Sequence, residues 1–377
     1  MTPINHLPPS SSNPFPLPSG DQNYIISALH YLKEHQGSRS SLSKRDFILL
    51  QKDEKTDGLF EEVFGLSQKN SSYDQILEQR LTLWENLSPN HKQAKEKILS
   101  FLQNPFQNRL DLQSLFLTTI PDIWEHSAFT SRLQWLYLNN NRLTSLPISL
   151  GSLSKLRCLY LNSNRLTSVA ACLGNLSKLR WLYLNNNRLT SLPTSLESLS
   201  NLRWLRLDHN ELSSIPSSLG TLSQLQWLYL NSNQLTFIPA SLGNLASLKE
   251  LRLDHNELLS IPPSLGTLSN LQWLYLNSNQ LTSIIASLER LTNLQWLNLE
   301  DNELTSIPAS LGNLTSLKEL RLDHNPLSSL PQRIFQLPST CKIHIKGCPL
   351  SSKTLQELPM GLNTRKYTGP RIFFTAP

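Results

Sequence analysis

Hydrophobic residues recur along most of this chain in one pattern, L-x-x-L-x-L-x-x-N-x-L, followed by a polar stretch and a second group of leucines. The Asn of the pattern returns every 23 residues over nine full copies. The nine residues are Asn141, Asn164, Asn187, Asn210, Asn233, Asn256, Asn279, Asn302 and Asn325. A constant period of this length predicts stacked copies of one structural unit that share a continuous hydrophobic core.

Each copy predicts a short strand and a return segment. The middle leucines, such as Leu136 and Leu138, alternate with other residues and therefore point to one side of a strand. Leu143, Leu146 and the later leucines turn the chain back and fill the same core. Pro147 fits a convex segment outside the sheet, because proline cannot donate a hydrogen bond to a strand ladder. The repeat therefore predicts one parallel strand per copy.

The Asn of each copy is expected to lie at a tight corner. Its amide can both donate and accept hydrogen bonds, so it can satisfy backbone groups that the corner leaves unpaired, and stacked copies would form a ladder. Two weaker copies flank the nine: Leu115 takes the Asn position upstream, and Cys348 takes it downstream. The repeats then span residues 108–350 in about eleven coils, and their sheet would be on the order of 50 Å long.

The pattern resembles the leucine-rich-repeat signature, and the resemblance covers about two thirds of the chain. The 23-residue form with I/L-P-x-x-L-G-x-L is similar to that of intracellular Ras-suppressor, scaffold and plant disease-resistance proteins, and it also occurs in bacterial proteins. The resemblance implies an α/β fold, a right-handed solenoid with a parallel sheet on its concave side. It also implies that the chain binds other proteins and does not catalyse a reaction.

The sequence outside the repeats divides into three segments. Residues 1–20 are rich in Pro, Ser and Asn and are predicted to be disordered. Residues 21–107 are predicted to be helical: Leu77, Leu81 and Trp84 share a helical face, and a last helix should stop at Asn104 before proline. This region either caps the first coil or forms an independent binding or targeting domain. Residues 351–377 form a basic tail, expected to cap the last coil and then fray.

Two variable positions in each strand point out of the predicted concave sheet, and they hold six of the eight Trp and five of the nine Tyr. Exposed aromatic patches usually mark interaction sites, and Trp, Tyr and Arg often dominate binding energy. The predicted partner-binding residues are Trp181, Tyr183, Trp204, Arg206, Asp208, Trp227, Tyr229, Arg252, Asp254, Trp273, Tyr275 and Trp296. Alternatively, the aromatic residues were copied by duplication and only stack between coils, with cation–π contacts of Tyr229 to Arg206 and Arg252.

Within this face, the fourth to seventh of the nine full copies are the predicted centre of binding. Trp204, Trp227 and Trp273 lie there beside arginines, which is the composition of binding hot spots. The copies nearer the N-terminus carry a more uniform Trp, Tyr and Asn set in the strand positions, and so offer fewer charges for specificity.

Another hypothesis is that the chain is an enzyme. The segment RLDHN occurs three times, and Ser232 lies between His209 and His255 in the same column. These two histidines would be about 10 Å apart, too far to share one metal ion. No strand–turn elbow, oxyanion hole or Cys-x-Asp motif of bacterial ubiquitin-ligase effectors accompanies them. We predict no catalytic, metal or cofactor site.

Composition narrows the class of partner. The net charge of +6 is small for 377 residues, so binding to nucleic acid is not predicted. No run approaches 18 apolar residues, so no membrane span is predicted. Four Cys indicate a reducing compartment, and the N-terminal segment has no Sec signal pattern. We expect a monomeric, cytoplasmic protein with a protein partner; the alternative is a bacterial effector, exported to a host cytosol, that uses the same face.

Overall fold

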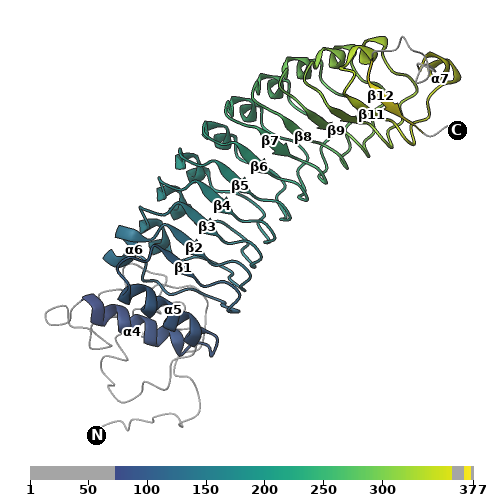
Figure 1. The fold of residues 1–377 in the computed structure, drawn as a ribbon. Helices are drawn as coiled ribbons and strands as arrows, with labels where there is room; N and C mark the ends of the chain where they lie inside the picture. The colour runs from purple at the N-terminus through teal and green to yellow at the C-terminus, as the bar shows by residue number, and fades with distance from the viewer. Residues whose placement is uncertain (1–72, 359–368, 375–377) are drawn as a thin grey trace, which may run out of the picture. The chain divides into compact units, whose positions relative to one another are not determined.

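The computed structural model describes residues 73–358 and 369–374, and the chain divides into two units, residues 1–89 and 90–377. In the first unit, α4 (Tyr73–Glu85) buries Leu77, Leu81 and Trp84, which share one helical face. The second unit contains α5 (His91–Gln103) and all the repeats, which follow one another along an arc in Figure 1. The predicted disordered segment 1–20 and the predicted helical residues before 73 lie outside the described residues.

A single parallel sheet contains one strand from each repeat, and the strands pair in chain order from β1 to β12. Each step joins equivalent positions, so Leu205 lies opposite Leu228, and Leu228 lies opposite Leu251. The prediction of one strand per repeat is confirmed, and coil n is the repeat that contains strand βn. The strands are β1 (Arg109–Asp111), β2 (Trp135–Tyr137), β3 (Cys158–Tyr160), β4 (Trp181–Tyr183), β5 (Trp204–Arg206), β6 (Trp227–Tyr229), β7 (Glu250–Arg252), β8 (Trp273–Tyr275), β9 (Trp296–Asn298), β10 (Glu319–Arg321), β11 (Lys342–His344) and β12 (Arg371–Phe373).

Short 3-10 helices form the opposite, convex side of coils 2–10 (Figure 1). Most follow a proline, such as Pro147 with φ −70°, because the fixed φ of proline suits this entry. The coils approach so closely here that a Cβ on Gly220 would lie 2.2 Å from the carbonyl oxygen of Ser241. The helices are η2 (Ile148–Ser152), η3 (Ala171–Asn175), η4 (Thr194–Ser198), η5 (Ser217–Thr221), η6 (Ala240–Asn244), η7 (Pro263–Thr267), η8 (Ala286–Arg290), η9 (Ala309–Asn313) and η10 (Gln332–Gln336).

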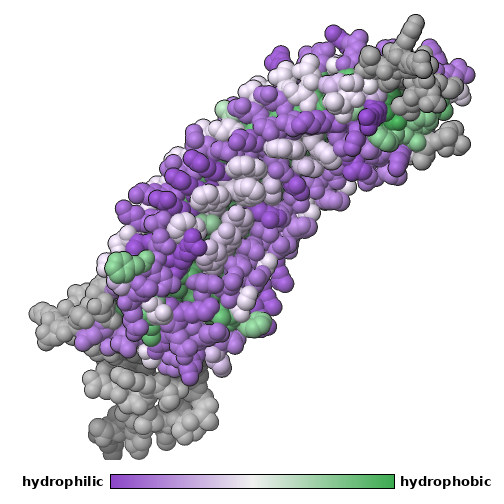
Figure 2. Space-filling model, viewed as in Figure 1, coloured by the Kyte–Doolittle hydropathy of each residue, from purple (hydrophilic) through white to green (hydrophobic). Residues whose placement is uncertain are grey.

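The core between the sheet and these helices consists of the repeat leucines. Leu136, Leu138 and Leu143 are fully buried, whereas Leu146 is only half-buried. Burial of a leucine side chain stabilises by roughly 1.5–3 kcal/mol, so the stacked leucines supply most of the stabilisation of the solenoid. The face shown in Figure 2 is largely hydrophilic, with hydrophobic residues gathered near the two ends of the solenoid.

The N-terminal end of the core is covered by helices. The 26-residue spacing of the first repeat accommodates a regular α-helix, α6 (Ser127–Arg132), where coils 2–10 have a 3-10 helix. Arg132 donates hydrogen bonds to the carbonyl oxygens of Phe101 and Leu102, at the end of α5, and stacks on the Phe101 ring. Phe101 also stacks on Phe129 of α6 at 5.5 Å. These contacts fix α5 against the first coils and close the core.

The C-terminal tail adds an element that the repeat pattern does not predict. About eleven coils are expected, and the sheet has a twelfth strand, β12, in which Ile372 lies opposite Ile343 of β11. The helix α7 (Ser352–Glu357) precedes it, capped by Ser351, and the Thr354 hydroxyl donates to the Ser328 carbonyl oxygen. The expected fraying falls largely on residues outside the described ranges. No helix within the described ranges combines the length and apolar character needed to cross a bilayer.

Candidate functional site

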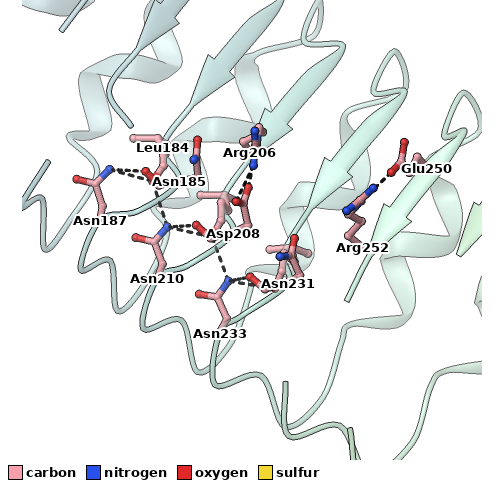
Figure 3. Close-up of polar contacts among 12 residues, drawn as sticks. Leu184, Asn185, Asn187, Arg206, Asp208, Asn210, Asn231, Asn233, Glu250 and Arg252 are labelled. Carbon is pink, nitrogen blue, oxygen red and sulfur yellow. Dashed lines mark hydrogen bonds and ion pairs between the residues drawn. The ribbon is translucent and has the colours of Figure 1, made fainter. Parts of the chain in front are cut away.

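The repeated Asn residues form a continuous ladder at the corner that follows each strand (Figure 3). Asn210 donates from its side-chain nitrogen to the carbonyl oxygens of Leu184 and Leu207 at 3.1 and 2.9 Å. Its side-chain oxygen accepts from the Leu189 N–H at 3.0 Å. Leu184 and Leu189 belong to the preceding coil, so each Asn joins two coils as well as closing its own corner. This set of bonds recurs from Asn164 to Asn325.

The ladder weakens at both ends. At the first step, Asn141 accepts from the backbone N–H groups of Leu115 and Leu117 and donates to the carbonyl oxygen of Leu112. Leu115, which takes the Asn position of the first coil, has no side-chain amide to continue the ladder. At the last step, the Cys348 thiol lies 3.3 Å from the carbonyl oxygen of Leu322. A thiol is a weak donor, so this joint carries less hydrogen bonding than an Asn joint.

The residue before each ladder Asn has a left-handed backbone. The φ angles of His209, Ser232 and His255 are 55°, 55° and 53°, and the same position in coil 11 is Gly347 with φ 71°. Asn, Asp and His are enriched in this region of φ/ψ space, and Gly adopts it freely. His209, Ser232 and His255, on which the enzyme hypothesis rests, therefore occupy a column with a left-handed backbone requirement.

The predicted aromatic and arginine residues project from the sheet in two columns, Asp208 and Asp254 follow the strands, and packing between coils covers much of the surface of these side chains. Trp181, Trp204, Trp227 and the other Trp side chains of these columns are half-buried rather than exposed. The register places Trp204 opposite Trp227, and their rings stack with centroids 4.8 Å apart. Stacking and partner binding are thus compatible, because a stacked indole still presents its outer edge.

Coils 2–4 carry a stack of tyrosines. The rings of Tyr137 and Tyr160 lie 4.7 Å apart and those of Tyr160 and Tyr183 lie 4.4 Å apart, with interplanar angles of 9° and 7°. Both faces of the Tyr160 ring are therefore covered. Burial raises the pKa of Tyr160 and of Tyr183, so both phenols remain protonated donors at neutral pH.

In coils 5–8 arginine alternates with tyrosine. The Arg206 guanidinium forms two hydrogen bonds with the buried Asp208 carboxylate, at 2.9 and 2.8 Å (Figure 3). Arg206 and Arg252 lie on either side of the Tyr229 ring, 5.4 and 5.0 Å from its centroid. Arg252 also lies 4.5 Å from the centre of the Tyr275 ring. The cation–π contacts expected for Tyr229 are present, and a further one joins Arg252 to Tyr275.

A pocket of about 400 Å³ opens where the Trp column is interrupted. Glu250 stands between Trp227 and Trp273 in the register, and its carboxylate binds Arg252 at 2.7 Å (Figure 3). Two strand spacings, about 10 Å, separate the two Trp backbones, and the pocket lies between them. Burial raises the pKa of Tyr229 to about 12.

Three pocket residues are not among the predicted binding residues: Lys249, Glu250 and Gln272. Lys249 lies 5.5 Å from the centre of the Trp227 ring and adds a cation to the rim. In the sequence, Glu250 in the Trp column was the signal that could have indicated these pocket residues. The adjoining column, which holds Lys249 and Gln272, borders the same face.

The remaining predicted residues lie at the margins of this group. Trp296 packs at an angle against Tyr275, with centroids 6.2 Å apart. Asp254 is half-buried, and its Oδ1 has no hydrogen-bond partner within the described part of the chain. Burial raises the pKa of this carboxyl group. The structure thus brings Trp204, Arg206, Asp208 and the pocket residues together, with Trp181 and Trp296 at either side.

Burial raises the pKa of all four thiols. Burial raises the pKa of Cys158 and of Cys341 to about 12, which leaves both groups protonated at neutral pH. The four cysteines are unpaired. Within residues 73–358 and 369–374, no group of three or more His, Cys, Asp or Glu side chains is arranged to hold a metal ion.

Three family models match the repeats. A leucine-rich repeat region matches residues 165–284, a leucine rich repeat model matches 269–327, and a model of two leucine rich repeat copies matches 131–173. No curated protein matches the sequence.

Solved structures with the same architecture include receptors and a bacterial protein. The plant peptide hormone receptor RGFR1, in complex with RGF2, is 35% identical over 60% of this chain, with a TM-score of 0.55. The ectodomain of the receptor kinase GASSHO1/SCHENGEN3 from Arabidopsis thaliana, in complex with CASPARIAN STRIP INTEGRITY FACTOR 2, is 34% identical over 60%, with a TM-score of 0.54. This chain covers 38% and 28% of those two receptor chains. InlJ from Listeria monocytogenes, 24% identical over 64% of this chain and 49% of its own, has a TM-score of 0.54 and supports the fold alone.

Proposed function

Because this chain is a leucine-rich-repeat protein, we propose that it is a non-catalytic module that binds a protein partner on its concave face, centred on β5–β8. The observation that carries the proposal is the pocket between Trp227 and Trp273, bordered by alternating Arg and Tyr side chains. Trp, Tyr and Arg are the residues that most often supply binding hot spots.

The rigidity of this surface supports the proposal. Arg206 is held by Asp208 on one side and Tyr229 on another, and Arg252 is held by Glu250 between two tyrosines. Side chains that are already ordered lose little conformational entropy when a partner binds, so more of the contact energy appears as affinity. A cavity of this size accommodates one large side chain of a partner.

The relatives support the class of partner. RGFR1 and GASSHO1/SCHENGEN3 are each described in complex with a second component, RGF2 and CASPARIAN STRIP INTEGRITY FACTOR 2 respectively, and both share the repeats with this chain. By analogy, we propose a peptide or protein partner here, and a role as an interaction module or scaffold.

A pull-down with the full chain, followed by affinity measurements on the partner recovered, tests the proposal. Trp227→Ala and Arg252→Ala should each weaken binding by about thirtyfold, equivalent to ~2 kcal/mol, because each removes a central anchor. Ala240→Glu, on the exposed convex surface, is the matched control and should bind like the wild type. Circular dichroism checks folding. Wild-type affinity in both anchor variants, together with a loss in Ala240→Glu, would place the partner on the convex side.

The cellular location is a separate part of the proposal. Four unpaired cysteines fit action in a reducing cytoplasm. Residues 1–30 fused to a reporter distinguish this from export: retention of the reporter in the producing cell supports the cytoplasmic assignment, and secretion supports the effector alternative.

A further inference from the structure

The positive charge of the chain is concentrated in coils 2–4. Residues 133–201 contain seven Lys and Arg but one acidic residue, Glu197. This excess equals the net charge of the whole chain, +6, so the rest of the sequence is neutral. The cations therefore form a regional feature, and an average over 377 residues conceals it.

Two of these arginines, Arg157 and Arg180, form a continuous row beside the concave face, and Arg203 of coil 5 extends it. The Arg180 N–H donates to the carbonyl oxygen of Arg157, and the Arg203 N–H donates to that of Arg180, so these residues sit in adjacent coils at equivalent positions. The same column supplies Lys249 to the pocket in coil 7, which shows that it borders the concave surface. Lys155 lies two residues before Arg157, and Lys178 lies two residues before Arg180. Both lysines are exposed.

These cations lack the carboxylate partners that arginines have elsewhere on the face. Arg206 pairs with Asp208, Arg252 with Glu250 and Arg321 with Glu300. In the described residues, no carboxylate forms an ion pair with the row or with its two neighbouring lysines. The pKa of Lys178 is lowered chiefly by the charge of Lys155, as expected where like charges crowd.

The tyrosine stack next to the row offers complementary chemistry. Stacked rings cover one another's faces and present their electropositive edges and hydroxyl groups outward. Phenolic hydroxyls donate hydrogen bonds to carboxylate oxygens. Single-stranded nucleic acids bind instead by stacking bases on free ring faces, which Tyr160 does not offer. The flat surface of a lipid bilayer does not fit into a concave sheet.

We propose that the concave face of coils 2–4 binds an acidic segment of the protein partner, whose carboxylates contact Arg157, Arg180 and the neighbouring Lys155 and Lys178. This inference rests on the proposed function and specifies its partner. The pocket would hold an anchoring side chain, and the basic row would hold an acidic stretch of the same partner some four coils away.

The test uses the full chain and a fluorescein-labelled peptide of alternating Glu and Ser, measured by fluorescence anisotropy. The row variant carries Lys155→Gln, Arg157→Gln and Lys178→Gln. The control variant removes the same charge elsewhere through Arg290→Gln, Arg333→Gln and Lys342→Gln, all at exposed positions. The row variant should bind about tenfold more weakly than the wild type, and the control should match the wild type. Affinity of the wild type should fall as salt is added.

Further binding measurements distinguish the proposal from its alternatives. The same peptide with Gln in place of Glu should not bind. Equal affinity of the row and control variants would overturn the proposal, as would tighter binding to a DNA duplex or to phosphatidylserine vesicles than to the Glu peptide. Trp227→Ala should leave binding of the Glu peptide unchanged, so failure of the pocket in the pull-down and failure of the basic row are separate results.

Discussion

Coils 2–4 and coils 5–8 differ only in what they place between the same core leucines. In coils 2–4, tyrosines stack on tyrosines, and the adjoining arginines lack carboxylate partners among the described residues. In coils 5–8, arginine alternates with tyrosine, and Arg206 and Arg252 are each held by a carboxylate. One surface keeps its charge available and the other has neutralised it internally. The solenoid thus separates the leucines that specify the fold from the variable surface residues that we propose bind a partner.

The first prediction tests whether the two regions share one frame. Asn164→Ala in coil 3 and Asn233→Ala in coil 6 each remove a side chain that makes the same three buried hydrogen bonds. Both should lower the free energy of unfolding by about 3 kcal/mol, measured by urea denaturation, because buried backbone groups lose their partners. Ser232→Ala, the matched control, should change little. A large difference between the two Asn variants would show that the regions differ below the surface.

The second prediction concerns Asp208 of coil 5, which is equivalent to Asp254 of coil 7. Asp208→Asn breaks the paired hydrogen bonds to Arg206 and should lower the free energy of unfolding by about 1 kcal/mol, since the guanidinium is partly exposed. It should also strengthen binding of the acidic peptide, because it makes coil 5 resemble coil 3. Unchanged peptide affinity would argue against internal neutralisation as the difference between the regions.

Substitution of Asp254 should raise the free energy of unfolding at neutral pH, in contrast to substitution of Asp208. Its pKa is raised in the folded state, chiefly by burial, so folding favours its protonated form. The stabilisation from this group is therefore present below the unfolded pKa and is lost as the pH rises through the folded pKa. Asp254→Asn should be more stable than the wild type at neutral pH, by less than about 1 kcal/mol. Urea midpoints should converge in acid; a difference that persists there would assign the effect to packing.

The smallest expected effect again tests the shared frame. Ser163→Gly and Ser232→Gly place glycine at positions with φ 58° and 55°, where the coil 11 equivalent is already Gly347. Relief of left-handed strain outweighs the extra entropy of glycine in the unfolded chain, so both should gain about 0.5 kcal/mol. Thermal unfolding measures the gain, and Ser→Ala at either position should not show it.

The constant spacing of the repeats made most of the fold predictable. The 23-residue spacing of the Asn residues places every strand from β2 to β10, since strand position and ladder position are locked together. β12 was not predictable, because Arg371–Phe373 has no flanking leucine pattern; it pairs through its backbone, through Ile372 and through the Phe373 ring, which stacks on His344. The helical character of the segment before the repeats is confirmed for α4 and α5, whereas the domain boundaries stay predictions.

The surface was less predictable than the fold, because it depends on which neighbours a side chain meets. Sequence alone shows Arg206 and Asp208 two residues apart, but not that Arg252 turns to Glu250 instead of Asp254. The arginine row lies in the next column, outside the two columns that hold the aromatic residues. The RLDHN histidines invited a chemical explanation, although Gly347 at the equivalent position indicated a backbone requirement. The binding residues themselves stay predictions.

The direction of the Asn ladder has a consequence for how the protein assembles during synthesis. Each Asn satisfies backbone groups of the coil before it: Leu189 N–H is satisfied by Asn210, and Leu212 N–H by Asn233. A nascent coil therefore keeps an unpaired N–H until the following coil has left the ribosome. Since translation proceeds from the N-terminus, the solenoid can close in the order in which it is made, always one coil behind the growing end. In the final coil of the repeats a thiol takes the place of the ladder Asn, and β12 pairs with the last repeat strand, so the ladder ends there.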